Sequence, residues 1–254
     1  MGGKIWGYDC YNLRQHGVLD IQTFVDIGAT AGDVSLMAMI LFPFARIVGI
    51  EPNKERFDRL KEFEGKRFNF YNIALGDGTP LYIKGKRAGQ QKFVPNKTSE
   101  TAVAVESKTL AQIFSDYNIN KDSRFILKCD CEGGEKSLID DWDNSLPIIQ
   151  KTIQFNLEIH IGAWNTKEDW NKALADIRKT HNIYIGNWIM DGRKKVKYFY
   201  SLFIGDLEEY KHGWLNIMAV KRFGNFHKDN DLYFNSLSPY WKWFCVKGVT
   251  NLWA

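Results

Sequence analysis

The segment TFVDIGATAGD at residues 23–33 is a short apolar run that stops at a glycine and enters a turn with a second glycine. The small and apolar residues at 34–44 then favour a helix. RIVGIEPN at 46–53 repeats the arrangement, because an apolar run ends at an acidic residue and a segment of mixed charge follows to residue 63. Strands that alternate with helices pair in parallel, so this region predicts an α/β fold.

The alternation continues along most of the chain. We expect three more strands, at 68–72, 124–129 and 152–160. We also expect three more helices, at 109–117, 136–142 and 166–180. Three late strand candidates could close the sheet with an antiparallel pair, at 182–189, 196–204 and 215–221. The predicted architecture is a mostly parallel sheet with helices on both faces and an antiparallel C-terminal strand.

Smaller features are expected between the third strand and the next helix. Residues 81–84 and 92–95 are typical of a small hairpin, and the polar segment 88–105 suits a mobile loop near a site. Ser107 is a candidate N-cap for the helix at 109–117.

Composition narrows the class of protein. The 254 residues fit one large domain or one domain with an appendage, and the net charge of +4 is spread among acids, which argues against nucleic-acid binding. No apolar run approaches the length of a membrane helix, and no signal-peptide pattern is present, so we expect a cytoplasmic protein with no membrane partner. Cys129 and Cys131 lack the second pair that completes a zinc site, which favours free thiols in a reducing compartment.

The chain changes in character at residue 223, after which aromatic residues become frequent. So many aromatic side chains are unfavourable in water. We therefore expect a domain at 1–222 and an aromatic C-terminal extension at 223–254 that packs on it. A homodimer contact, a lid over the site and a contact to a further domain of a longer polypeptide are the alternatives.

Three motifs fall at the carboxyl ends of predicted strands, where ligands of parallel sheets bind. In the first, Asp26 precedes Gly28 and Gly32, which let the turn tighten and a ligand approach the backbone. A dinucleotide-binding turn has glycine where Thr30 stands, and the threonine side chain would crowd a pyrophosphate. The second motif is Glu51, whose carboxylate could accept hydrogen bonds from both ribose hydroxyls of an adenosine cofactor.

The third motif is KCDCEGGE at 128–135, followed later by EIH at 158–160. If the two strands are neighbours, Asp130 and Glu132 meet Glu158 and His160. Burying so many ionisable groups is costly, and such clusters are usually functional. Glu135 is equally consistent with a place at the N-terminus of the next helix and with a role in the site.

The order of these motifs resembles that of the FkbM-type methyltransferases, from about residue 23 to residue 160. The matching segments are VDIGA at 25–29, EPN at 51–53, NIALG at 72–76, KCDCEGGE at 128–135 and EIH at 158–160. The resemblance implies a Rossmann-like class I fold that uses S-adenosylmethionine (SAM) to methylate hydroxyl groups, commonly on sugars and natural products. Thr30 departs from the family, in which asparagine is common there.

The resemblance also implies which residues form the site. SAM is expected at Asp26, Gly28, Glu51 and Asn72, with Gly32 completing the first turn, and the acceptor at Asp130, Glu132, Glu158 and His160. We expect His160 to take the hydroxyl proton, with Glu158 or Asp130 orienting its ring. The rival is Mg²⁺ or Mn²⁺ held by Asp130, Glu132 and Glu158.

The acceptor and the class of function leave alternatives open. A sugar or glycan could stack on Trp164, Trp188, Trp241 or Trp243. A non-catalytic methyltransferase-like module for binding or assembly is one alternative function. An NAD-dependent oxidoreductase is another, and Thr30 argues against it.

Overall fold

The computed structural model describes residue 13 and residues 20–84, 92–94, 103–161, 166–191, 194–203, 205–209 and 214–222. The aromatic extension at 223–254, and with it the expected domain boundary, lies outside the described residues, as do the side chains of all four candidate sugar-stacking tryptophans. Within the described part, no helix is long and apolar enough to cross a membrane.

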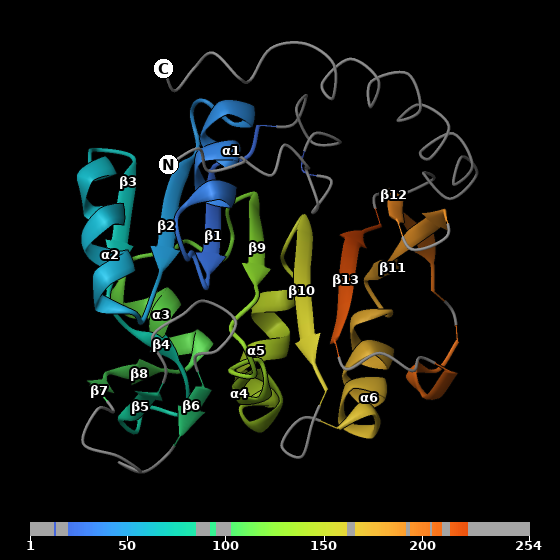
Figure 1. The fold of residues 1–254 in the computed structure, drawn as a ribbon. Coiled ribbons are helices and arrows are strands. Elements are labelled where there is room, and N and C mark those ends of the chain that lie inside the picture. Colours follow the sequence, from blue (N-terminus) through green and yellow to red (C-terminus); the bar gives the residue numbers. More distant parts are fainter. Residues whose placement is uncertain are drawn as a thin grey trace.

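One large sheet organises the molecule (Figure 1). Its eight strands lie in the order β12 (Lys194–Leu202), β11 (His181–Asp191), β13 (Trp214–Lys221), β10 (Gln154–His160), β9 (Phe125–Cys129), β1 (Thr23–Ile27), β2 (Arg46–Ile50), β3 (Phe68–Tyr71). The strands from β10 to β3 pair in parallel, whereas β13 pairs antiparallel with both β10 and β11. The predicted sheet with an antiparallel C-terminal strand is confirmed.

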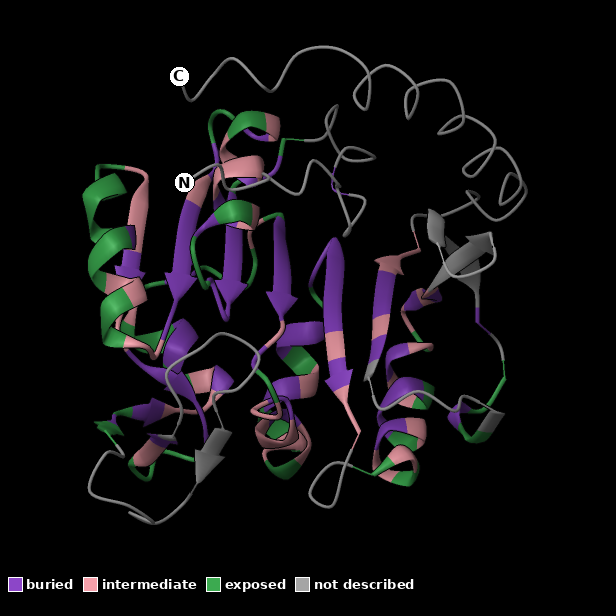
Figure 2. Ribbon diagram, in the orientation of Figure 1, coloured by how far each residue is buried: buried purple, intermediate pink, exposed green. Residues whose placement is uncertain are grey.

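The central strands are buried on both faces (Figure 2), and alternate side chains feed two separate cores. Phe24, Ile47 and Ile126 share one face, where they pack with helix α1 (Asp33–Leu41). Val25 and Leu127 point to the other face, in a cluster with α3 (Leu110–Asp116), α5 (Trp142–Ile149) and α6 (Lys167–Ile177). The expected helices on both faces are therefore present.

The other helical segments are α2 (Lys54–Leu60), α4 (Lys136–Asp140) and the short 3-10 turns η2 (Lys61–Phe63) and η3 (Leu207–Glu209). Two details differ from expectation. Thr109, not Ser107, caps α3, and it forms a capping box with Gln112. The single helix expected at 136–142 is two helices, and the second continues to Ile149 although it contains Pro147.

Short strands lie beside the carboxyl edge of the large sheet (Figure 1). β4 (Ala74–Leu75) pairs with β8 (Ser107–Lys108), and β5 (Leu81–Lys84) pairs with both β6 (Lys92–Val94) and β7 (Val103–Val105). The predicted hairpin is confirmed by β5 and β6. The prediction of a loop over 88–105 is wrong at β6 and β7, because both strands pair with β5. Val105 is also buried against Ile83.

Candidate active site

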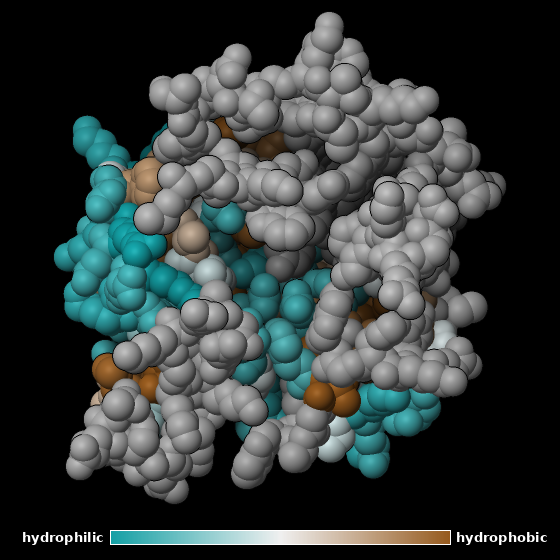
Figure 3. Space-filling view, viewed as in Figure 1, coloured by the Kyte–Doolittle hydropathy of each residue, from teal (hydrophilic) through white to brown (hydrophobic). Residues whose placement is uncertain are grey.

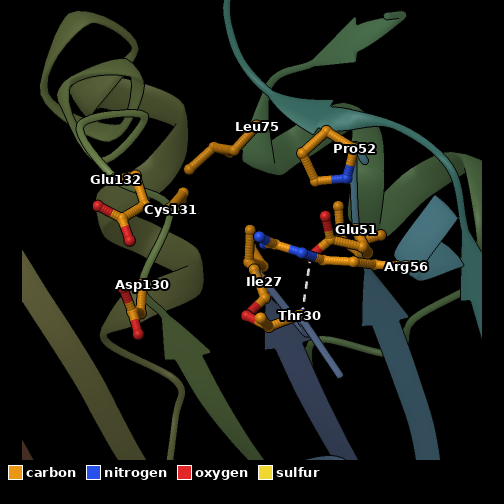
Figure 4. A pocket seen from close by; sticks show the side chains of 11 residues that line it. Ile27, Thr30, Glu51, Pro52, Arg56, Leu75, Asp130, Cys131 and Glu132 are labelled. Atoms are coloured by element: carbon orange, nitrogen blue, oxygen red, sulfur yellow. Dashed lines mark hydrogen bonds between the residues drawn. The ribbon is translucent and has the colours of Figure 1, made fainter. Parts of the chain in front are cut away.

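A pocket opens where β1, β2 and β9 end side by side (Figure 4). The space in it amounts to about 600 Å³, which includes open solvent at its mouth. Hydrophilic side chains gather at this part of the surface (Figure 3). The pocket is lined by Ile27, Gly28, Thr30, Ile50, Glu51, Pro52, Arg56, Leu75, Asp130, Cys131 and Glu132.

Gly28 brings the first turn against the end of β9. It has a φ of 82°, and a Cβ atom built on it would lie 1.8 Å from the carbonyl oxygen of Asp130. No other residue fits there without moving backbone, so the glycine is required by the close approach of two chain segments. Gly32 also has a positive φ, but it packs against Leu60 and does not line the pocket.

Glu51 is held rigidly at the end of β2. Its Oε2 accepts a hydrogen bond from the Thr30 backbone N–H at 2.7 Å, and its Oε1 accepts one from Asn53 at 2.8 Å. Burial raises the pKa of Glu51, and the two backbone hydrogen bonds oppose that rise. A carboxylate has about four acceptor positions, so lone pairs are left for ligand hydroxyls.

Two expected cofactor residues support the pocket from outside it. Asn72 donates hydrogen bonds to the carbonyl oxygens of Glu51 and Pro52, both at 2.9 Å. Asp26 is fully buried, accepts a hydrogen bond from Ser35 at 2.7 Å and lies 3.0 Å from the Lys128 ammonium. Neither lines the pocket, so the structure places them as supports of the strand ends.

Lys128 ties the first turn to β9. Its ammonium donates a hydrogen bond to the carbonyl oxygen of Gly28 at 2.7 Å and is only 3% exposed. Burial alone would lower the pKa of Lys128, but the charges of Asp26 and Asp130 outweigh burial and raise it. The lysine therefore stays charged beneath the pocket.

His160 stands among carboxylates, as the third motif predicts. Its Nε2 lies 3.6 Å from Glu132 and 3.5 Å from Glu158. Its Nδ1 lies 3.1 Å from Oε1 of Glu135 and makes a hydrogen bond there. Glu135 therefore orients the ring, a role that the sequence predicts for Glu158 or Asp130.

Glu135 is the site residue whose role the sequence leaves open. It is completely buried, and its two oxygens accept backbone hydrogen bonds from Cys131 at 2.7 Å and Gly133 at 3.0 Å. It makes no side-chain cap on α4. Its carboxylate instead fixes the tight turn that carries Glu132, whose φ is 54°, and holds His160 at the same time.

The charges in this cluster decide its protonation. Burial alone would lower the pKa of His160, but the hydrogen bond and charge of Glu135, with the charges of Glu158 and Asp130, raise it to about 9. Burial, reinforced by the charge of Asp130, raises the pKa of Glu158 to about 7. At neutral pH the imidazole is protonated, and Glu158 can still take up a proton.

A divalent metal fits this cluster poorly. Among the described residues, the potential ligand atoms that approach within 4.8 Å of one another belong to Asp130, Glu135 and His160, a different set from the expected one. Glu135 already accepts hydrogen bonds from two backbone N–H groups, and its Oε1 is also bonded to Nδ1 of His160. No chemical step is therefore assigned to a metal.

Arg56 is a pocket residue that the sequence motifs do not indicate. It is the third residue of α2, and its side chain reaches back over Glu51 (Figure 4). A basic residue in the first turn after a strand-end acid is the signal that could have drawn attention to it.

Solved structures share remote similarity with this chain. Precorrin-6y C5,15-methyltransferase from Geobacter metallireducens GS-15 is 15% identical over 82% of this chain and 88% of its own, with a TM-score of 0.37. M. capricolum TrmK, solved with S-adenosyl-homocysteine, is 13% identical over 95% of this chain and 89% of its own, with a TM-score of 0.40. No curated protein matches the chain.

The family comparison is specific. The model described as the methyltransferase FkbM domain matches residues 26–184, well over half of the chain. The matched region contains Glu51, the motif at 128–135 and the pair at 158–160. Together with the order of the strands and of the motifs along them, this match identifies the chain as a member of the FkbM methyltransferase family.

Proposed function

We propose that this methyltransferase transfers the methyl group of SAM to a hydroxyl group of a sugar, on a glycan or a glycosylated small molecule. One observation carries the proposal. The pocket that contains Glu51 also contains Asp130 and Glu132, and Glu132 faces His160 in the acid–base cluster. A donor nucleoside held at Glu51 therefore lies in the same cavity as Asp130 and Glu132, and His160 and Glu158 adjoin that cavity through Glu132.

The pocket fits the donor. The free lone pairs of Glu51 match the two ribose hydroxyls, and Gly28 lines the pocket beside it. Asp130 and Glu132 offer negative charge to a cationic ligand. SAM supplies a methyl group that is already activated on a sulfonium, so the protein mainly has to align the acceptor with it.

Glu158 is the base in this proposal. As the S–CH₃ bond breaks and the O–CH₃ bond forms, the hydroxyl proton passes to the Glu158 carboxylate. The pKa of about 7 suits this task at neutral pH. His160, which the sequence favoured as the base, keeps its own proton because its pKa is about 9, and its charge holds Glu158 and Glu132 in place.

A sugar suits the acceptor side because several oxygen acceptors converge there. Asp130, Glu132 and Glu158 can each accept hydrogen bonds from neighbouring hydroxyls, a pattern that polyols match. The net charge of +4 is small and its basic residues are interleaved with acids, which argues against a nucleic-acid acceptor. The expected family chemistry, methylation of hydroxyl groups, points the same way.

The first test is calorimetric titration with S-adenosylhomocysteine (SAH). We expect the wild-type chain to bind and Glu51→Ala to lose binding. Glu55→Ala is the matched control, because Glu55 is an exposed acid on α2 that pairs with Arg59. A folded wild-type protein that binds NADH and not SAH would overturn the proposal in favour of an oxidoreductase.

The second test assigns the base. With a sugar acceptor identified by screening, kcat should rise with pH through an apparent pKa near 7, and Glu158→Gln should lower kcat by about 10²- to 10⁴-fold. A rise centred near pH 9, abolished by His160→Gln, would return the base role to His160. EDTA should leave turnover unchanged, and loss of activity restored by Mg²⁺ would establish the metal instead. SAH binding without turnover on any acceptor would favour a binding module.

A further inference from the structure

Arg56 is fixed by its helix in a position to reach the pocket. The side chain of Asn53 caps α2 and accepts a hydrogen bond from the Arg56 backbone N–H at 3.0 Å. The residue therefore stands in the first turn, directly after the strand end that carries Glu51. Figure 4 shows its side chain extending across Glu51 towards Ile27.

The guanidinium group of Arg56 has no partner among the residues that the structure describes. Within the described part of the chain it forms no hydrogen bond or ion pair, although it is half-buried. Arg59, three residues later, is 72% exposed and pairs with Glu55 at 2.6 Å. The charge of Arg56 acts on both Glu51 and Glu132, so the group lies within range of both ends of the pocket.

The two ends of the pocket are chemically distinct. The acid–base cluster stands beside β9 and β10, so the reactive end of the donor must point there. The nucleoside end must then lie towards β2 and α2, where Glu51 ends its strand. Among the described cations of α2, Lys54 and Arg59 are exposed and paired with acids on the same helix, which leaves Arg56 for the nucleoside.

We propose that Arg56 binds the nucleoside half of the donor, with its planar guanidinium packed over the purine that is held beside Glu51. This inference rests on the proposed function, since it needs the ribose at Glu51. A guanidinium stacks well on a flat aromatic ring, and its delocalised charge is weakly hydrated. Lysine would keep the charge but lose the flat face.

The test compares two ligands, SAH and 5′-methylthioadenosine, which has the nucleoside but lacks the amino-acid carboxylate. In calorimetric titrations, Arg56→Ala should weaken both ligands by the same factor, on the order of tenfold. Arg56→Lys should restore only part of that loss. Arg59→Ala removes the same charge from the same helix outside the pocket, and it should leave both affinities unchanged.

The outcomes separate the two proposals. Weakening of SAH but not of methylthioadenosine would show that Arg56 contacts the carboxylate, which overturns the purine assignment. Unchanged affinity for both ligands in Arg56→Ala would overturn the role of Arg56 and leave the methyltransferase proposal standing. A wild-type protein that binds neither ligand would overturn the methyltransferase proposal and the inference with it.

Discussion

At the scale of single residues, Gly28 occupies a pocket-lining position that only glycine fits. We expect Gly28→Ala to lower the free energy of unfolding by about 3 kcal/mol and to abolish SAH binding, because the new Cβ meets the Asp130 carbonyl at a positive φ. Gly65→Ala is the control, since a Cβ on Gly65 meets nothing within 4 Å. Urea unfolding measures both, and equal stability of the two variants would contradict the steric account.

Glu135 is the residue that sets the charge of His160. In Glu135→Gln, we expect the pKa of His160 to fall from about 9, because the variant keeps the shape of the carboxyl group and loses its charge. Glu132→Gln should lower it less, since Glu132 lies 3.6 Å away and is 44% exposed. NMR titration of the imidazole gives both values, and a larger effect of Glu132→Gln would contradict this ranking.

The same pKa makes stability depend on pH. The pKa of His160 is raised in the folded protein from the ordinary 6.5, so its protonated form stabilises the fold. That contribution is complete below about pH 6.5 and is lost as pH rises through about 9. Urea unfolding at both pH values should show a larger loss in the wild type than in Glu135→Gln.

The sequence reveals residue types at strand ends better than it reveals side-chain direction. Gly28 and Glu51 were predicted in the pocket and line it. Asp26 precedes the end of β1 by one residue, so its side chain points to Lys128 and away from the pocket. Glu135 could not be assigned, because its contact with His160 depends on how two distant segments pack.

At the scale of elements, a capping box stabilises the N-terminus of α3. Thr109 accepts a hydrogen bond from the Gln112 backbone N–H, and the Gln112 side chain accepts one from Thr109. We expect Thr109→Ala to lower the free energy of unfolding by about 1 kcal/mol. Ser115→Ala, at an exposed position of the same helix, should change it by less than about 0.5 kcal/mol in thermal unfolding. Equal effects would mean that the cap adds nothing.

Strands that bury both faces were predicted closely, and elements that depend on partners were not. β1, β2 and β9 are mostly apolar and almost entirely buried, so the sequence pattern indicates them, although β1 contains Asp26 and β9 contains Lys128. β7 was not predicted as a strand, because it is three residues long and its backbone depends on pairing with β5. The helix α5 contains Pro147, which argues locally against a helix, and its packing in the core overrides that preference.

At the scale of the whole molecule, the pocket depends on a sheet order that sequence patterns do not specify. The chain places β9 beside β1, about a hundred residues away, and so brings Asp130 against Gly28. It also inserts β13 between β10 and β11. The motifs predict which residues belong to the site. The connections between the strands determine which of these motifs lie side by side.

Lys128 and Asp26 connect the two central strands at this junction, and both are almost completely buried. Lys128→Met should lower the free energy of unfolding by about 3–5 kcal/mol, because it leaves the charge of the buried Asp26 carboxylate without its ion-pair partner. It should also weaken SAH binding, since Lys128 holds the carbonyl group of Gly28. Lys151→Met is the matched control, because Lys151 pairs with Asp122 at the surface, and it should cost less than about 1 kcal/mol. If urea unfolding gave similar losses for both variants, the buried pair would not be what joins β1 to β9. The turn would then be held in place mainly by the close contact of Gly28 with the end of β9.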